Sequence, residues 1–162
     1  MSDIVILPVE GKSMNLGGLG IVFKLISEDT NGSFALVEHP IEPHTLGAPP
    51  HLHHNEDEYS YILEGEVTVL VGERVIQAGP GTLVAKPRGI MHTFWNTGAE
   101  PAKILEIIAP GGFEHYFEEV VGLAAAGVMP NDPRWQLVGQ KYHLEFDPSR
   151  IPELLRTYNL KM

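Results

Sequence analysis

The sequence predicts an all-β domain, a sandwich or a barrel, with a helical segment in its C-terminal part. Short β-like runs broken by Gly and Pro fill residues 1–110, whereas helical patterns and an irregular tail fill residues 111–162. Residues 20–110 lack the helical segments that a parallel α/β sheet would need between its strands. We therefore expect a β-barrel over residues 1–110 and an extension over residues 111–162 that packs on it, as one domain overall.

Eight β-like runs carry this prediction, and turn residues separate them. Examples of these turns are Asn31-Gly32, Gly72-Glu73 and Gly79-Pro80-Gly81. Short strands at regular spacing with turns between them are typical of all-β sandwiches and barrels. The runs are residues 20–26, 33–39, 58–63, 66–71, 74–77, 82–85, 92–96 and 103–109.

Residues 113–127 have a different pattern. Phe113, Phe117 and Val120 belong to a set of apolar residues that recur at spacings of three and four, which predicts an amphipathic helix. Gly127 suits its C-terminal cap, and Pro130 prevents its continuation. The apolar side of this helix either packs plainly on the barrel or also covers its mouth as a lid. A second, shorter helix is expected over residues 152–158.

Composition narrows the range of partners. Eleven Lys and Arg against 21 Asp and Glu give a formal net charge of −10, which argues against binding nucleic acid or an anionic membrane surface. With no cysteine, the chain has no disulfide, thiolate ligand or Cys nucleophile. It has no apolar run near the ~20 residues that span a bilayer and no basic-then-apolar start. A cytoplasmic protein is expected.

A histidine cluster is the most informative feature. Five of the eight His lie between residues 39 and 54, and His51 and His53 stand two apart. On a strand, residues two apart point to the same side, so both imidazoles can aim at one point. Glu58 opens the next strand, and His92 opens a strand after the Gly81 turn. Imidazole and carboxylate together suit Fe, Ni, Mn, Cu or Zn. Histidines without a metal are the alternative interpretation.

The neighbouring residues are interpreted more plainly. His54 alternates away from His53 and should lie outside the pocket. Glu56 and Asp57 are expected to be solvated carboxylates. Phe94 has the same strand parity as His92, so it should face the cavity, with Trp95 on the other side.

Two motifs resemble those of the cupin superfamily. The first is His51-Leu52-His53, four residues, Glu58, six residues and Gly65. The second combines these residues at the superfamily's spacing: Gly81, Pro87, Gly89, His92 and Asn96. One position departs from the pattern, because Thr45 stands where the superfamily usually has a glycine.

The resemblance implies a double-stranded β-helix, or jelly-roll barrel. It also implies one divalent metal ion inside the barrel mouth, held by His51, His53, Glu58 and His92, with Fe, Ni, Mn, Cu or Zn as candidates. Cupins of this size are often homodimers, so a homodimer is expected.

The arrangement is similar to single-domain quercetin 2,3-dioxygenase-like cupins. This implies a dioxygenase that cleaves a small enol or phenol with dioxygen, with Glu58 as the general base. Phe94, Phe113 and Phe117 are the candidate substrate-pocket residues. The alternatives are a non-redox metal-dependent isomerase, decarboxylase or hydrolase, and a non-catalytic small-molecule-binding barrel.

Overall fold

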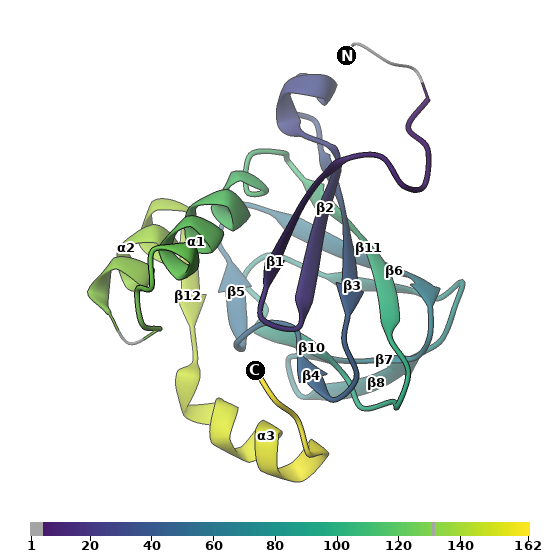
Figure 1. Cartoon of the computed structure of the whole chain (residues 1–162), viewed down its shortest axis with the longest axis vertical. Helices are drawn as coiled ribbons and strands as arrows, with labels where there is room; N and C mark the ends of the chain where they lie inside the picture. Colours follow the sequence, from purple (N-terminus) through teal and green to yellow (C-terminus); the bar gives the residue numbers. More distant parts are fainter. Residues whose placement is uncertain (1–4, 131) are drawn as a thin grey trace.

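The computed structural model describes residues 5–130 and 132–162 of the chain. In this part, two six-stranded antiparallel sheets stack as a sandwich, and helices follow in the C-terminal region (Figure 1). The predicted fold class, an all-β jelly-roll with C-terminal helices, is confirmed.

The first sheet carries the long central strands of the molecule. Along β11, every second residue is buried, so Ile104, Glu106 and Ile108 face the interior between the sheets. The strand order is β1-β2-β3-β11-β6-β9. The bounds are Lys12–Leu16 (β1), Leu19–Leu25 (β2), Ala35–Ile41 (β3), Ala102–Ala109 (β11), Asp57–Glu64 (β6) and Leu83–Lys86 (β9).

The second sheet contains the histidine strands. Its order is β12-β5-β10-β7-β8, and the short strand β4 also pairs with β10. Phe94 and Trp95 on β10 point to opposite sides: Phe94 packs in the core between the sheets, and Trp95 packs against α3. The bounds are Leu144–Phe146 (β12), His51–His53 (β5), His92–Asn96 (β10), Val67–Val71 (β7), Arg74–Ala78 (β8) and Thr45–Leu46 (β4).

All eight predicted runs are strands, with ends shifted by one or two residues in most of them. Outside these runs, β5 holds His51 and His53, which the sequence interpretation also placed on a strand, whereas β1, β4 and β12 were not predicted. Each is short or lies at an edge, and none has the alternation of apolar residues that marks a half-buried strand. The prediction that residues 20–110 hold no helix needs one correction, because a single 3-10 turn, η1 (Ser27–Thr30), joins β2 to β3.

Three α-helices follow β11, and β12 lies between the second and the third of them. The helix expected over residues 113–127 is α1 (His115–Ala125), and the one expected over 152–158 is α3 (Ile151–Tyr158), which a short turn, η2 (Pro148–Arg150), precedes. The helix α2 (Pro133–Lys141) was not predicted, although Asp132 caps it by accepting a bond of 2.9 Å from the Arg134 amide. In Figure 1, α1 and α2 lie together beside β12, and α3 lies apart from them near β4 and β10.

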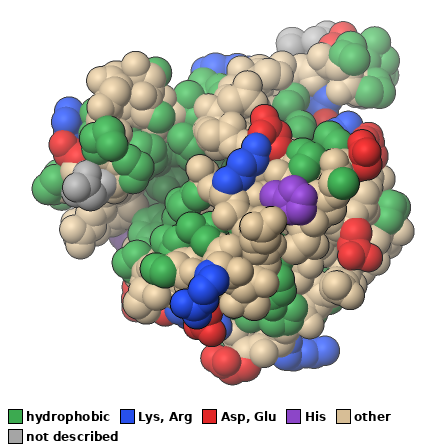
Figure 2. Space-filling view, turned by 60° about the horizontal axis from the view of Figure 1, so that its bottom comes forward, with side chains coloured by type: hydrophobic (Ala, Val, Ile, Leu, Met, Phe, Trp, Pro, Cys, Tyr) green, Lys and Arg blue, Asp and Glu red, His purple; other side chains and the backbone are tan. Residues whose placement is uncertain are grey.

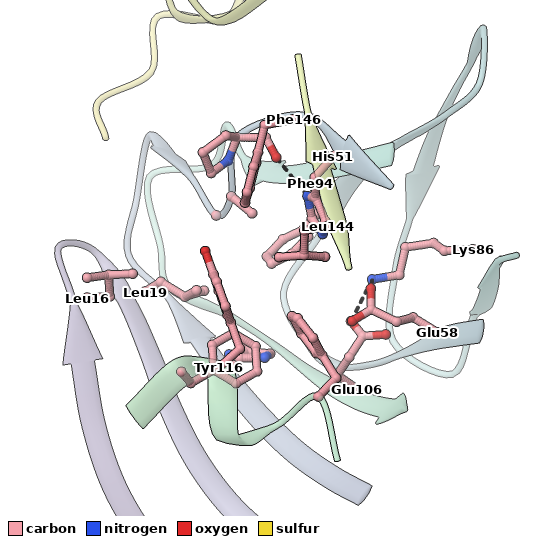
Figure 3. A pocket seen from close by; sticks show the side chains of 16 residues that line it. Leu16, Leu19, His51, Glu58, Lys86, Phe94, Glu106, Tyr116, Leu144 and Phe146 are labelled. Carbon is pink, nitrogen blue, oxygen red and sulfur yellow. Dashed lines mark hydrogen bonds and ion pairs between the residues drawn. The ribbon is translucent and has the colours of Figure 1, made fainter. Parts of the chain in front are cut away.

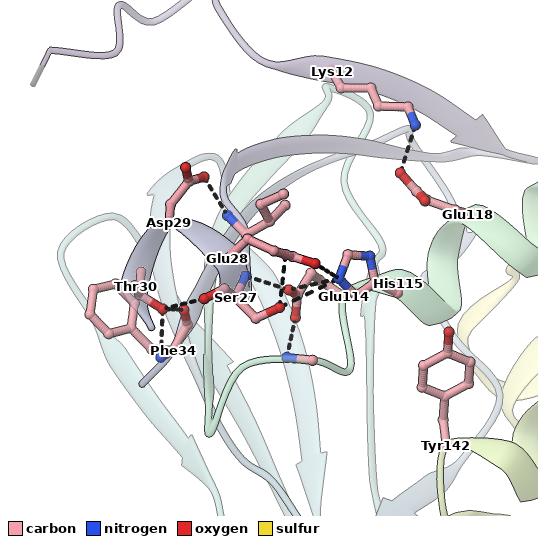
Figure 4. A network of polar contacts seen from close by, with 12 residues as sticks. Lys12, Ser27, Glu28, Asp29, Thr30, Phe34, Glu114, His115, Glu118 and Tyr142 are labelled. Atoms are coloured by element: carbon pink, nitrogen blue, oxygen red, sulfur yellow. Dashed lines mark hydrogen bonds and ion pairs between the residues drawn. The ribbon is translucent and has the colours of Figure 1, made fainter. Parts of the chain in front are cut away.

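The start of α1 is fixed to the barrel by one buried carboxylate. Glu114 is fully buried and accepts bonds of 2.6 Å from the backbone amides of Ser27 and Gly112 (Figure 4). Ser27 belongs to η1 and Gly112 precedes the helix, so this side chain joins the first sheet to the segment that carries Phe113. Further along, Glu118 forms an exposed ion pair of 2.6 Å with Lys12.

We expect Glu114→Gln to loosen α1. The amide group of Gln would face one backbone donor with another donor, and an unmatched buried polar group costs about 1–3 kcal/mol. Hydrogen exchange of the amides of residues 115–125 should become faster. The matched control is Glu118→Gln, which removes an exposed charge from the same helix and should leave exchange near the wild-type rate. Unchanged exchange in Glu114→Gln would contradict this anchoring role.

Candidate metal centre

Three strands bring the predicted ligands together. His51 and His53 lie two apart on β5 and point to the same side, and His92 on β10 pairs directly with His51. Glu58 reaches the same point from β6, in the other sheet. All four side chains are buried, and one ligand atom from each lies within 4.8 Å of the others.

The short distances within the cluster join Glu58 to two rings. Its Oε2 lies 3.1 Å from His92 Nε2, and its Oε1 lies 3.4 Å from His53 Nε2. The His51 ring is next to that of His92, with centroids 4.5 Å apart. The group therefore forms one compact, buried cluster of three imidazoles and a carboxylate.

The outer nitrogens of the three rings all have acceptors. His51 Nδ1 lies 2.8 Å from the Pro49 carbonyl, His92 Nδ1 lies 2.9 Å from the Ile90 carbonyl, and His53 Nδ1 lies 3.2 Å from Glu56 Oε2. These contacts assign the ring proton to Nδ1, so each Nε2 presents a lone pair. His53 Nε2 is buried and has no hydrogen-bond partner among the described residues. Lone pairs that converge on a carboxylate fit a bound cation.

The protonation states also fit a cation. Burial lowers the pKa of His51 well below its ordinary value, and the nearby His92 and His53 rings lower it further. Burial likewise lowers the pKa of His92. Burial alone would raise the pKa of Glu58, but the Lys86 ammonium and the nearby rings outweigh it and hold that pKa well below its usual range. At neutral pH His51, His92 and Glu58 are thus ready to bind a cation without releasing protons.

A cavity of about 70 Å³ lies beside the cluster, and His51 and Glu58 form part of its wall (Figure 3). The predicted pocket residues Phe94, Phe113 and Phe117 all line it. Phe113 also packs on the His53 ring, with centroids 4.3 Å apart. Phe113 and the first turns of α1 therefore cover the cavity, which is where the lid alternative places them.

Three residues of this region were missed by the sequence interpretation. Glu56 was expected to be solvated, but it is buried against His53, so that expectation is wrong. Lys86 and Glu106 were not singled out, yet both are buried and line the cavity. Their signal is strand parity, since each stands on the inward side of its strand. His54, in contrast, is exposed as predicted.

Part of the chain matches a known protein family, and its fold matches solved structures. Residues 38–108, which include all four clustered residues, match the Cupin_2 family, described as the cupin domain. The fold is that of a cupin. The matched range is less than half of the chain, and together with the solved cupin-fold structures it shows a resemblance to cupins. A comparison with curated protein sequences found no match. The finer resemblance to quercetin 2,3-dioxygenase-like proteins stays a prediction.

Solved structures share this cupin fold. KdgF from Halomonas sp. has a TM-score of 0.60 and 14% identity, covering 70% of this chain and 99% of that chain. The polyketide cyclase RemF from Streptomyces resistomycificus has a TM-score of 0.59 and 22% identity, covering 67% and 80%. A putative sugar phosphate isomerase from Acidithiobacillus ferrooxidans has a TM-score of 0.52 and 25% identity, covering 63% and 69%. At such identities, the first two establish the fold alone.

Two further predictions concern the cellular location and the oligomeric state of the protein. In the described part of the chain, no helix has the length and apolar character needed to cross a membrane. Figure 2 shows Lys and Arg side chains separated from one another by acidic and apolar ones on the face in view. The cytoplasmic location and the homodimer stay predictions.

Proposed function

We propose that this cupin is a metal-dependent enzyme that transfers a proton within a small enolisable molecule, such as an α-hydroxy ketone. The observation that carries the proposal is the cluster of His51, His53, His92 and Glu58 at the wall of a cavity that several aromatic side chains also line. One side of the cluster faces that cavity, as a catalytic metal site requires, whereas a structural site would be closed.

The residues have separate roles in this proposal. His51, His53, His92 and Glu58 would hold one divalent metal ion, which supplies a Lewis acid that polarises a carbonyl oxygen. The Glu58 carboxylate accepts the proton of the C–H next to that carbonyl group, because it is ionised at neutral pH and the side chain lies on the cavity wall. Phe94, Phe113 and Phe117 keep water away from the reacting atoms and so strengthen the electrostatic interactions there.

The size of the cavity favours a small substrate. Its volume of about 70 Å³ is well below the roughly 300–1,000 Å³ typical of sites for drug-sized ligands. A flavonol would need the cover formed by α1 to move. The name of one similar structure, a putative sugar phosphate isomerase at 25% identity, supports chemistry without dioxygen. A dioxygenase acting on a small enol or phenol is the second candidate, because the three-His-one-Glu set also suits Fe, Ni, Mn or Cu.

One pair of assays separates these candidates. Protein reconstituted separately with Zn, Mn, Ni or Fe is incubated anaerobically in deuterated water with dihydroxyacetone, and loss of the C–H signals is followed by NMR. The same preparations are then tested for oxygen uptake with catechol and quercetin. We expect C–H exchange that disappears in chelator-treated protein and in Glu58→Gln. Oxygen uptake without exchange would replace the proposal by a dioxygenase, and neither activity would favour a binding protein.

A further inference from the structure

A row of polar side chains lies on the inward face of the first sheet, where the neighbouring positions hold buried apolar residues. Glu58 lies opposite Lys86 in the pairing of β6 with β9, and Ser60 lies opposite Glu106 in the pairing of β6 with β11. The inward neighbours along these strands are apolar, such as Ile62 and Ile104. A buried ion pair in such a layer adds little stability over well-packed apolar residues. Its presence beside a cavity therefore suggests a role in binding.

The two carboxylate oxygens of Glu106 differ in their contacts. Its Oε2 accepts a bond of 2.8 Å from Lys86 Nζ and another of 2.8 Å from Ser60 Oγ. Its Oε1 is buried and has no hydrogen-bond partner among the described residues, and the side chain lines the cavity. Figure 3 shows the Lys86 ammonium pointing toward the carboxylates of Glu58 and Glu106. One carboxylate oxygen in the cavity wall thus lacks a donor.

We propose that Glu106 is a specificity-determining residue whose Oε1 accepts a hydrogen bond from a substrate hydroxyl. The site would then select small molecules that carry a hydroxyl on the carbon next to the carbonyl group whose oxygen is bound at the metal ligands. This inference rests on the proposed function, because it assumes a metal on His51, His53, Glu58 and His92. It deepens that function by naming the chemical group that the substrate must carry.

Lys86 is the positioning residue of this arrangement. Its Nζ lies 3.0 Å from Glu58 Oε2 and 2.8 Å from Glu106 Oε2, so one ammonium bridges the two carboxylates. This bridge, with Ser60, leaves Glu106 Oε1 as the oxygen available to a ligand. A hydroxyl that reaches this buried carboxylate gains a charge-assisted hydrogen bond. A methyl group in its place leaves the oxygen desolvated and unpaired, which is a strong basis for rejection.

The test compares two hydroxamates that differ only in a hydroxyl and a methyl group. Glycolohydroxamate and propionohydroxamate both chelate metal ions, and their dissociation constants are measured with the full-length Co²⁺-loaded protein from its visible spectrum. The pH is kept above 7, because burial raises the pKa of Glu106 to about 7. We expect wild-type protein to bind glycolohydroxamate roughly tenfold more tightly, as a charge-assisted hydrogen bond implies.

The variant Glu106→Gln sharpens this test without changing the size of the side chain. Ser60 and Lys86 both donate, so they would hold the amide oxygen and leave the amide NH₂ where Oε1 stood. The cavity then presents a neutral donor, so the charge-assisted bond is lost. The hydroxyl can only accept from this amide, and the preference should fall well below tenfold while bound cobalt stays stoichiometric. The matched control is Glu64→Gln, an exposed carboxylate at the end of β6, which should keep the preference.

The outcomes separate this inference from the proposed function. If both hydroxamates bind wild-type protein equally, the role of Glu106 is overturned while an accessible metal site remains. If neither binds although cobalt is present, both proposals fail. If Glu106→Gln does not fold, the preference of wild-type protein for glycolohydroxamate still tests the role of Glu106. If the variant folds and keeps the same preference, the inference is refuted.

Discussion

His92→Ala is expected to abolish stoichiometric metal binding and all metal-dependent activity. His92 Nε2 lies 3.1 Å from Glu58 Oε2 at the centre of the cluster, and alanine offers no ligand there. Losing an outer partner of a ligand typically lowers metal affinity or activity about 10–100-fold, so losing a ligand itself should lower the affinity further. The measurement is elemental analysis of reconstituted protein after dialysis, with metal affinity from competition with a chromogenic chelator.

Stability provides a second readout for the same variant. Metal that binds only the folded protein stabilises it by about 2.7 kcal/mol at a free concentration 100 times the dissociation constant. Wild-type protein should therefore melt at a higher temperature with metal, and His92→Ala should show almost no shift. The matched control is His54→Ala, which removes an exposed imidazole close to the cluster. Full metal content in His92→Ala would refute the ligand assignment.

Lys86→Met is expected to have the largest effect on stability. The ammonium is buried and is the shared partner of Glu58 and Glu106, so its removal leaves two buried carboxylates without their cation. Removing one partner of a buried ion pair typically costs about 3–5 kcal/mol. Urea unfolding of the metal-free protein should show this loss. Added divalent metal should restore part of it, because Glu58 would regain a cation.

The loss should depend on pH. Burial raises the pKa of Glu106 from 4.5 to about 7, so its protonated form suits the folded state better than the unfolded one. The contribution of this raised pKa to the free energy of unfolding is complete below pH 4.5 and is lost as the pH rises through 7. Without the Lys86 ammonium the pKa of Glu106 rises further, so Lys86→Met should be least harmful in acid and most harmful above pH 7.

An exposed pair supplies the control for this prediction. Lys103 forms an ion pair of 2.7 Å with Glu64 at the surface, and Lys103→Met should change stability by less than about 1 kcal/mol. If Lys86→Met proves as stable as wild-type protein at every pH, the two buried carboxylates do not depend on the ammonium, and the charge arrangement described for the cavity is wrong.

The fold class and the candidate metal ligands could be predicted from the sequence because their patterns are local. Turn residues between short β-like runs predicted the all-β class, and the spacing of His51 and His53 predicted two imidazoles on one side of a strand. Glu58 and His92 stood at the starts of runs in the expected motifs, and the structure brings all four together.

The polar residues in the cavity wall, Lys86 and Glu106, could not be predicted from the sequence in the same way. Lys86 and Glu106 are 20 residues apart, and their contact depends on the register of β6 with both β9 and β11. Register is a long-range property, so a single strand shows only which residues share a side. Glu56 was misjudged because it stands beside other charged residues in the sequence, although the turn after β5 brings it back to His53.

The pairing of β12 with β5 has a consequence for how the protein is made. Leu144 and Phe146 lie opposite His53 and His51, so the strand that carries two of the candidate ligands has a neighbour synthesised some 90 residues later. While the chain is emerging from the ribosome, the other strands can pair before this edge is covered. We therefore expect the nascent chain to acquire its full affinity for metal only after residues 144–146 are released. Chains that stop before them should bind metal poorly and be degraded quickly.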